Sequence, residues 1–313
     1  MAKYTLKIDR EDKTYELMPE SEVVWETVRK SAPSKLTFTL PDTSFIPKEG
    51  DRVRFFADDK GIFLGYIFKV LTQKEKITVT CYDQLRYLKN KDNYIYQNKT
   101  ASELLKMIAG DFLLKTDVIE DTVYRIPYRV EDSKTLFDII ETALDLTYEN
   151  TGAEFVLYDN FGGLSLVNIN TLQRNLLIDS TSFEDYSNLS SIDDSYNKIK
   201  LIHEDNRKKV RKIFLKEDKA SQKKFGVLQY YSHISGNENG TLKATKLLSE
   251  LNKVKKSLTL TGVKGDLSVF AGSKVYIDTS VYKGNMTVLK AAHNFSENAH
   301  TMTLSLKGGD IGE

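Results

Sequence analysis

An alternation of apolar and polar residues dominates the first ninety positions of the chain. Apolar side chains occupy every second position in residues 4–8, 36–40, 53–55 and 77–81, which is typical of strands with one buried face. Four of the five prolines lie between these segments, where proline marks turns and strand ends: Pro19, Pro33, Pro41 and Pro47. The pattern predicts short antiparallel strands of a small barrel or sandwich.

The apolar spacing becomes helical after residue 99. Thr100 and Glu103 form a capping-box pattern at the start of a helix with apolar residues at 104, 105, 108 and 112. Ser133 begins a second helix, whose apolar face is Leu136, Phe137, Ile140 and Leu144. Strand patterns lie at 123–130, 154–158 and 164–168, and a turn with two glycines at 159–163 joins the last two. This stretch is therefore α+β.

The last part of the chain returns to strands, with one more helix. Residues 199–201 and 210–215 alternate like the two arms of a hairpin, and a helix is expected over 241–256. Alternating segments then resume from residue 258 and precede a glycine-rich tail at 308–312.

The two β-rich ends resemble one another. Residues 34–39 resemble 256–261, and 50–55 resemble 272–277. Gly50 follows Leu36 by 14 residues, and Gly272 follows Leu258 by the same 14. Further along, Gly65 matches Gly284, and the strand at Ile77 matches residues 302–306. Chance is the alternative explanation, because glycine turns are common in β proteins, but the shared order and spacing favour two barrels of one fold.

These patterns predict a mainly β, α+β fold with two related β-barrels. The first barrel covers residues 1–92 and an α+β middle domain covers 93–194. The second barrel is discontinuous and combines 195–219 with 258–313. Residues 220–257 are expected to be an insertion whose helix, 241–256, docks on the middle domain. Gly50 and Gly272 should occupy equivalent turns in the two barrels.

Composition and charge narrow the class of protein. The 313 residues are 40% hydrophobic and 28% charged, so the chain can bury a core and is not disordered. A formal net charge of +1 argues against a dedicated nucleic-acid binder, and the short basic run at 207–209 fits a solvated hairpin tip. The first residues do not resemble a signal peptide, and no window is apolar enough to span a membrane. We expect synthesis in the cytoplasm and no membrane partner.

Candidate catalytic and metal-binding residues are few. Cys81 lies inside an alternating segment, so it fits a packed strand better than a nucleophile. The four histidines are His203, His233, His293 and His300, and His203 lacks the second histidine of a zinc-protease helix. His293 and His300 flank a turn and can approach each other, but no cysteine or clear carboxylate completes a metal site.

Adjacent acids and glycines also fall short of a site. The acid pairs at 11–12, 58–59 and 193–194 fit exposed turns, and Gly162–Gly163 lack the helix start that phosphate binding needs. We therefore expect no catalytic, cofactor-binding or metal-binding residue, and no cofactor.

Several segments resemble a known family. In their order and spacing, residues 81–92, 98–104, 195–199 and 225–231 resemble the XkdQ/YqbQ-like proteins of PBSX-type defective phages and of R-type bacteriocins, or tailocins. The resemblance covers nearly the whole chain. Its most specific part is the segment Tyr82, Asp83, Gln84, Leu85, Arg86, Tyr87 and Leu88.

The resemblance implies a structural hub of a contractile-tail baseplate, similar to the central hub of T-even phages and to the VgrG base of type VI secretion. In such relatives a homotrimer places two tube-protein-like barrels per subunit in a pseudo-sixfold ring, which adapts a hexameric tail tube to a threefold spike. The implied partners are the tail-tube protein, the central spike or tail-tip protein, other baseplate subunits, and the tape-measure protein or DNA in the lumen. The implied location is the baseplate of a virion or a phage-tail-like particle. The alternative function is a tail-associated lysin that degrades peptidoglycan.

Overall fold

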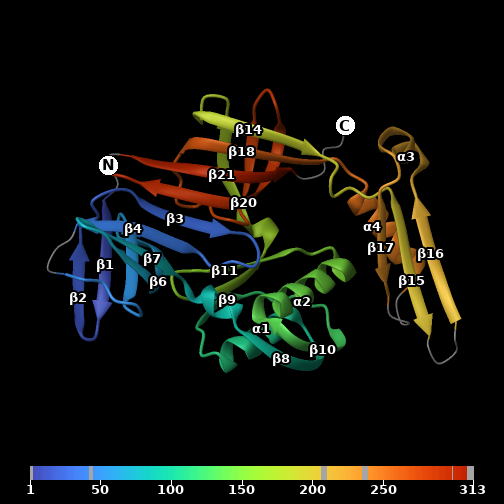
Figure 1. The fold of residues 1–313 in the computed structure, drawn as a ribbon, viewed down its shortest axis with the longest axis horizontal. Coiled ribbons are helices and arrows are strands. Elements are labelled where there is room, and N and C mark those ends of the chain that lie inside the picture. The colour runs from blue at the N-terminus through green and yellow to red at the C-terminus, as the bar shows by residue number, and fades with distance from the viewer. Residues whose placement is uncertain (1–2, 42–44, 206–209, 235–238, 298, 309–313) are drawn as a thin grey trace. The chain divides into compact units, whose positions relative to one another are not determined.

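The computed structural model describes residues 3–41, 45–205, 210–234, 239–297 and 299–308 (Figure 1). The chain forms two compact units, one of residues 1–187 with 259–313 and the other of residues 188–258. Strands form most of the regular structure and helices are few. The predicted mainly β, α+β class is therefore confirmed.

The first copy of the repeat is made of seven strands. They lie side by side in the order β3-β4-β7-β6-β5-β1-β2. Alternation places one face of each strand in the core, as at Leu36, Phe38 and Leu40 of β4. The bounds are β1 (Tyr4–Arg10), β2 (Lys13–Leu17), β3 (Val23–Val28), β4 (Lys35–Pro41), β5 (Arg52–Ala57), β6 (Lys60–Thr72) and β7 (Lys76–Tyr82).

The second copy repeats this strand order with segments from later in the chain. Its order is β14-β18-β21-β20-β19, which corresponds to β3-β4-β7-β6-β5. A further strand, β13, pairs with β19 as β1 pairs with β5, but β13 runs parallel to its neighbour and β1 runs antiparallel. The bounds are β13 (Gln173–Asp179), β14 (Asp185–Ser191), β18 (Lys255–Lys264), β19 (Lys274–Asp278), β20 (Lys283–Phe295) and β21 (His300–Gly308).

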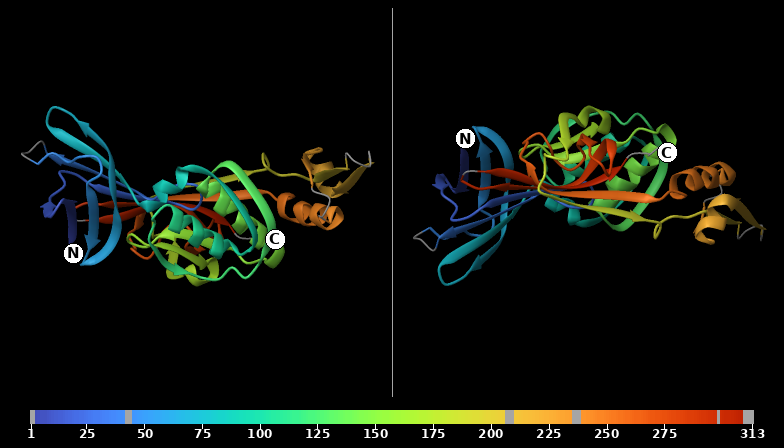
Figure 2. Two further views of the ribbon diagram at one scale, coloured as in Figure 1. Left: turned by 90° about the horizontal axis from the view of Figure 1, so that it is seen from below. Right: turned by 90° about the horizontal axis from the view of Figure 1, so that it is seen from above.

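The two copies belong to one sheet. β3 of the first copy pairs antiparallel with β20 of the second, and the two strands lie side by side in Figure 1 and in the other views of Figure 2. Together the copies form a 13-stranded sheet. The duplication predicted from sequence is therefore confirmed by the strand order of the structure.

The middle segment forms a helical and sheet layer with its own core. Two helices pack together over a two-stranded sheet, β10-β8, and a three-stranded sheet, β11-β12-β9. The bounds are η1 (Gln84–Lys89), β8 (Lys91–Lys99), α1 (Ala101–Asp111), β9 (Thr116–Ile119), β10 (Ile126–Thr135), α2 (Leu136–Thr151), β11 (Phe155–Asp159), β12 (Leu164–Asn168) and η2 (Ile169–Leu172).

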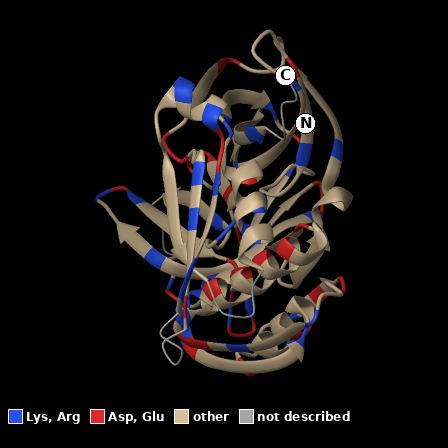
Figure 3. Ribbon diagram, turned by 90° about the vertical axis from the view of Figure 1, so that its right-hand side faces the viewer, with Lys and Arg blue, Asp and Glu red and all other residues tan. Residues whose placement is uncertain are grey.

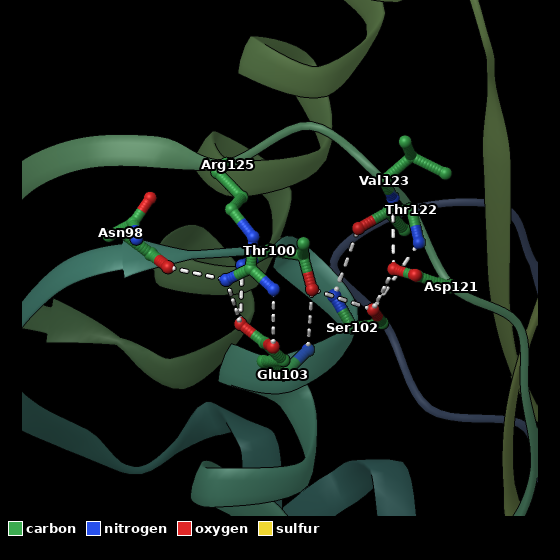
Figure 4. Close-up of polar contacts among 8 residues, drawn as sticks. All are labelled: Asn98, Thr100, Ser102, Glu103, Asp121, Thr122, Val123 and Arg125. Carbon is green, nitrogen blue, oxygen red and sulfur yellow. Dashed lines mark hydrogen bonds and ion pairs between the residues drawn. The ribbon is translucent and has the colours of Figure 1, made fainter.

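The predicted capping box at the start of α1 is confirmed (Figure 4). Glu103 N–H donates to Thr100 Oγ1 at 3.2 Å, and Thr100 N–H donates to Glu103 Oε2 at 3.0 Å. Arg125 pairs with the same carboxylate at 3.3 Å and donates to the Asn98 carbonyl at 2.8 Å. The box therefore also ties the strand before the helix to the loop that precedes β10.

Residues 188–258 form the second unit. Its sheet has the order β16-β15-β17, and helix α4 packs on β15 and β16. The core between them contains Ile199, Leu201 and Ala244. The bounds are β15 (Lys198–Asp205), β16 (Val210–Glu217), α3 (Lys219–Phe225), β17 (Gln229–His233) and α4 (Gly240–Leu251).

Two predicted domain boundaries are wrong. Residues 195–219 were expected in the second barrel, but their hairpin pairs with β17 and forms one unit with 220–257. The apolar face of helix 241–256, expected to dock on the middle domain, covers this sheet, and the helix ends at Leu251. In turn, β13 and β14, expected within the middle domain 93–194, complete the second copy. The alternating pattern of a hairpin does not indicate which other strand it pairs with. The sequence pattern therefore could not assign this hairpin to the correct domain.

Candidate functional site: two copies of one turn and the junction between them

The most closely repeated feature is a glycine turn. Gly50 has φ +88° and Gly272 has φ +103°, a region that side chains disfavour. Gly50 N–H donates to the Ile67 carbonyl at 2.9 Å, and Gly272 N–H donates to the Val288 carbonyl at 2.8 Å. The next residue of each turn accepts from the same partner strand, from Ile67 N–H and from Val288 N–H. The predicted equivalence of the two glycines is confirmed.

A side chain stabilises each turn in the same way. In the first copy Asp51 Oδ2 accepts from Lys48 N–H at 2.9 Å, and in the second Ser273 Oγ accepts from Phe270 N–H at 3.1 Å. An arginine from the flanking strand then donates to that side chain: Arg10 of β1 to Asp51 at 3.0 Å. Arg174 of β13 donates to Ser273 at 3.4 Å. The parallel strand β13 therefore replaces β1 in this contact as well as in the sheet.

A β-bulge follows the turn in both copies. The register of β6 against β7 shifts between Ile67 and Lys69, and that of β20 against β21 shifts between Val288 and Lys290. This alignment corrects one sequence match, because Val53 pairs with Gly65 whereas its counterpart Val275 pairs with Met286. Gly65 therefore corresponds to Met286 and not to Gly284 two residues earlier. The stretch between turn and bulge is one residue longer in the first copy than in the second.

The junction of the copies begins immediately beyond the second turn. Arg29 N–H donates to the Leu289 carbonyl at 2.9 Å, and β3 then pairs with residues 290–295 of β20. Glu26 of β3 pairs with Lys290 at 2.8 Å and also with Lys35 of β4. The salt bridges lower the pKa of the Glu26 carboxyl, whereas its burial opposes this shift. Backbone ladder and charge pairing thus both hold the copies together.

The predicted approach of His293 and His300 is confirmed. The two rings meet through Nδ1 of His293 and Nε2 of His300 at 2.9 Å. His293 Nε2 lies 2.8 Å from the Val269 carbonyl, so it carries the proton and Nδ1 accepts from His300. Burial lowers the pKa of His293 to about 4. In the described chain, no group of three or more potential metal ligands surrounds these rings, and the pair acts as a neutral hydrogen-bonded core element.

A buried pair of acids was not foreseen from sequence. Asp83 lies in the segment that carries the family resemblance, caps η1 through Leu85 N–H at 3.0 Å, and accepts from Ser34 N–H at 3.1 Å. Burial and the nearby Asp159 raise the pKa of Asp83 well above its usual range. Burial also raises the pKa of Asp159 to about 6. In the sequence, an Asp directly before a short helix indicates only that it caps the helix N-terminus.

The remaining candidates lie where packing or solvation explains them. Cys81 is fully buried in β7, and burial raises the pKa of its thiol. Asp58 and Asp59 are exposed in the β5–β6 turn with φ +47° and +63°. The acids at 11–12 and 193–194 are also exposed, and Gly162–Gly163 form the β11–β12 turn. His203 contacts the Ile234 carbonyl at 3.4 Å, and His233 packs on Tyr231.

A cavity of about 250 Å³ lies at the junction with the middle segment. Trp25, Asp159 and Arg174 are among its lining residues, and Trp25 Nε1 is buried there with no hydrogen-bond partner among the described residues. Its volume falls below the roughly 300–1,000 Å³ of typical ligand pockets. The cavity is therefore too small to indicate a substrate site for a cell-wall polymer.

Charge is distributed without a dominant sign. Basic and acidic segments are interspersed along the ribbon in Figure 3, in agreement with the formal net charge of +1. None of the helices in the described ranges has the length and apolar character to cross a bilayer.

Comparison with known proteins identifies the family. The YQBQ-like family matches residues 23–307, nearly the whole chain. The chain belongs to the YQBQ-like family. Two Bacillus subtilis (strain 168) members are similar to it: the uncharacterized protein YqbQ, 31% identical over 96% of this chain and 95% of its own length, and the phage-like element PBSX protein XkdQ, 30% identical over 93% of each. The resemblance inferred from sequence is confirmed.

Solved structures show how widely this fold occurs. The 43 kDa tail protein of prophage MuSo2 from Shewanella oneidensis has a TM-score of 0.73 at 11% identity, over 96% of this YQBQ-like chain and 98% of its own. A tail protein from Neisseria meningitidis MC58 has a TM-score of 0.69 at 12% identity, over 98% and 97%. The Escherichia coli c3393 protein has a TM-score of 0.58 at 10% identity, over 98% and 77%. The YQBQ-like chain therefore has the fold of these proteins.

Proposed function

We propose that this protein is a structural hub of a contractile-tail baseplate. Its subunits form a trimer in which six similar modules, two per chain, surround a central lumen. The observation that carries the proposal is the repeated strand order, β3-β4-β7-β6-β5 and β14-β18-β21-β20-β19. A ring of three such chains has threefold symmetry overall and approximate sixfold symmetry of its modules, so it can join a hexameric tube to a threefold spike.

The names of the similar proteins support this proposal. XkdQ is a protein of a phage-like element, and the similar structures from Shewanella and Neisseria are tail proteins. The Escherichia coli c3393 protein is described as a component of the type VI secretion system, similar in structure to the T4 tail proteins gp27 and gp5. Two of these relatives are thus tail proteins, and a third is similar in structure to tail proteins.

The proposed ring has two different faces. The tail-tube protein binds one face, and the spike or tail-tip protein binds the other, with further baseplate subunits at the periphery. The lumen passes the tape-measure protein or DNA without base-specific contacts, which agrees with the balanced charge of the chain. The protein is synthesised in the bacterial cytoplasm and incorporated into a virion or a tailocin.

Sedimentation or native mass measurement tests the proposal. The protein is measured alone over a wide concentration range and then mixed with its tube and spike proteins. We expect a trimer, favoured at high concentration or by either partner. A chain that remains monomeric and binds neither partner contradicts the hub function.

The alternative function is a peptidoglycan-degrading lysin, and it is tested separately. The surface acids described above are solvated in turns, and the buried acids Asp83 and Asp159 cap backbone N–H groups. We expect no clearing of a suspension of purified cell walls in a turbidity assay. The lysin function would be favoured if the isolated chain cleared the cell-wall suspension and if replacing a single Asp or Glu abolished this clearing.

A further inference from the structure

The junction inside the chain provides a template for a contact between chains. β20 pairs with β19 over residues 283–287, and the same edge then continues beyond the Gly272 turn, where β3 pairs with residues 290–295. This pairing buries both partners: Ala291 and His293 on β20, and Val23 and Trp25 on β3. The turn and bulge place this edge in register for an added strand.

The corresponding edge of the first copy is open. β5 pairs with residues 60–66 of β6, and the edge continues past the Gly50 turn into residues 69–72. Among the described residues, no strand pairs with this second part, whose other edge is occupied by β7. Leu71 is 45% exposed, whereas the equivalent stretch of β20 buries alternate residues. Lys69 occupies the place of Lys290, which pairs with Glu26 in the template.

The strand that corresponds to β3 is also open. β14 ends the 13-stranded sheet and pairs only with β18 within the described chain. Every residue from 185 to 190 is exposed, including Tyr186 at 47% and Leu189 at 59%. Exposed apolar side chains on an unpaired edge are a liability unless another strand covers them. One chain therefore carries both halves of the template junction, each without its partner.

We propose that β14 of one subunit adds antiparallel to residues 69–72 of β6 in the next subunit. This inference rests on the proposed ring and specifies its subunit contact. The edge of β6 receives the strand as the edge of β20 receives β3. Continuing the Glu184–Thr261 pairing along β14 makes Leu189 the counterpart of Thr27. Because Thr27 lies opposite Ala291 and Val70 is the counterpart of Ala291, the template register places Val70 opposite Leu189. A second copy of this chain is the occupant, because the two open edges correspond to the two halves of a junction that the chain already contains. The contact is heterologous, so each subunit gives one strand and receives one, and three subunits form a ring when the rotation between neighbours closes on the third.

The backbone geometry of β14 agrees with this assignment. Glu184 N–H donates to the Thr261 carbonyl of β18 at 2.9 Å. Because N–H groups alternate between the two edges of a strand, those of odd-numbered residues such as Leu189 point away from β18. These N–H groups can donate to an added strand, as Arg29 N–H donates to the Leu289 carbonyl in the template junction.

Disulfide cross-linking tests the contact directly. The variant combines Val70→Cys with Leu189→Cys, and the buried Cys81 does not interfere. After mild oxidation of the full chain at trimer-forming concentration, we expect a three-chain species that returns to one chain on reduction. The matched control combines Val70→Cys with Tyr186→Cys. Its cysteines lie three residues out of register, about 10 Å too far. Pairs of Val70→Cys with cysteine at 188 and at 190 cover a shift of one residue.

A proline variant adds a second measurement. Leu189→Pro removes an N–H that points outward and leaves the pairing with β18 in place, whereas Leu189→Thr keeps the N–H. We expect the proline to weaken trimer formation at least tenfold at an unchanged melting temperature of the monomer, and the threonine to weaken it less.

The outcomes separate the contact from the ring itself. A trimer by sedimentation without a cross-link at 188, 189 or 190, or a trimer that Leu189→Pro leaves intact, overturns the β14–β6 contact and leaves the hub function standing. Equal cross-linking of the Tyr186 control also overturns the contact. A chain that stays monomeric and shows no cross-link overturns both proposals.

Discussion

The two copies share one backbone fold but differ in the residues and strands that contact it. Both place a glycine with positive φ before a bulged strand. A Cβ added to Gly50 would have no atom of the described residues within 4 Å, whereas one added to Gly272 would lie 2.5 Å from Cγ1 of Val156 in the middle segment. The first copy leaves a strand edge open, and in the second β3 fills that edge. A repeated fold can thus keep its local geometry while each copy acquires different neighbours.

The largest expected difference between the copies is at these two glycines. Gly50→Val and Gly272→Val both impose backbone strain, about 1–3 kcal/mol. Gly272→Val also forces a side chain against Val156, which adds about 1–3 kcal/mol of overpacking. We expect both variants to lose stability in urea denaturation and Gly272→Val to lose more. Equal losses would show that the surroundings do not matter, and no loss in either would contradict the turn assignment.

Two buried groups, an acid of the middle segment and a base of the second copy, should respond to pH in opposite directions. The acid Asp159, which ends β11 near the η1 cap Asp83, has its pKa raised by burial from 3.8 to about 6. The folded state therefore binds more protons than the unfolded state between these values, and stability falls as pH rises from about 4 to 6, by up to about 3 kcal/mol. We expect Asp159→Asn to remove this loss and to be more stable than wild type at pH 7 in chemical denaturation.

The base His293 of the second copy has its pKa lowered from 6.5 to about 4. Here the unfolded state binds more protons, so stability falls as pH decreases from about 6.5 to 4, again by up to about 3 kcal/mol. In a background that carries both Asp83→Asn and Asp159→Asn, neither buried acid opposes this slope, and stability should increase with pH throughout that window. A flat profile in that variant would contradict the assignment of a buried neutral His293.

The smallest expected effect is at Cys81, which occupies the place of Leu306 in the second copy. Both side chains are fully buried, so Cys81 acts as a small apolar group. We expect no reaction with a thiol reagent in the native state and full reaction in denaturant. Rapid labelling of the native chain would show that β7 opens locally, and a Leu306→Cys variant provides the matched comparison.

The local elements could be predicted from sequence because their signals are local. Alternation identified β4 and β7, and the capping box at Thr100 identified α1. The repeat was found because Gly50 and Gly272 need a rare backbone conformation that constrains the residue type. The buried position of Cys81 and the meeting of His293 with His300 followed from the same strand patterns.

The long-range pairings could not be predicted in the same way. β13 and β14 have the composition of any exposed strand, and their partners lie about 70 to 100 residues later in the chain. The hairpin at 198–217 alternates as a barrel strand does, but it pairs with β17. The acid at Asp83 has the same residue type as the solvated acids of the turns, and only tertiary burial distinguishes it. Sequence alone therefore identified the elements but not their neighbours.

The pairing of β3 with β20 has a consequence for how the chain folds. The paired residues of β3 and β20 are separated by about 260 positions in the sequence. β3 therefore cannot pair with β20 until nearly the whole chain has been synthesised. At roughly 5–20 residues per second, the delay is on the order of 13 to 50 s. During that time the edge of β3 is open in every nascent chain, beside neighbouring chains on the same messenger. Correct folding therefore depends on β20 of the same chain reaching β3 before another chain does, and slow synthesis or a truncated C-terminus should favour intertwined aggregates over rings.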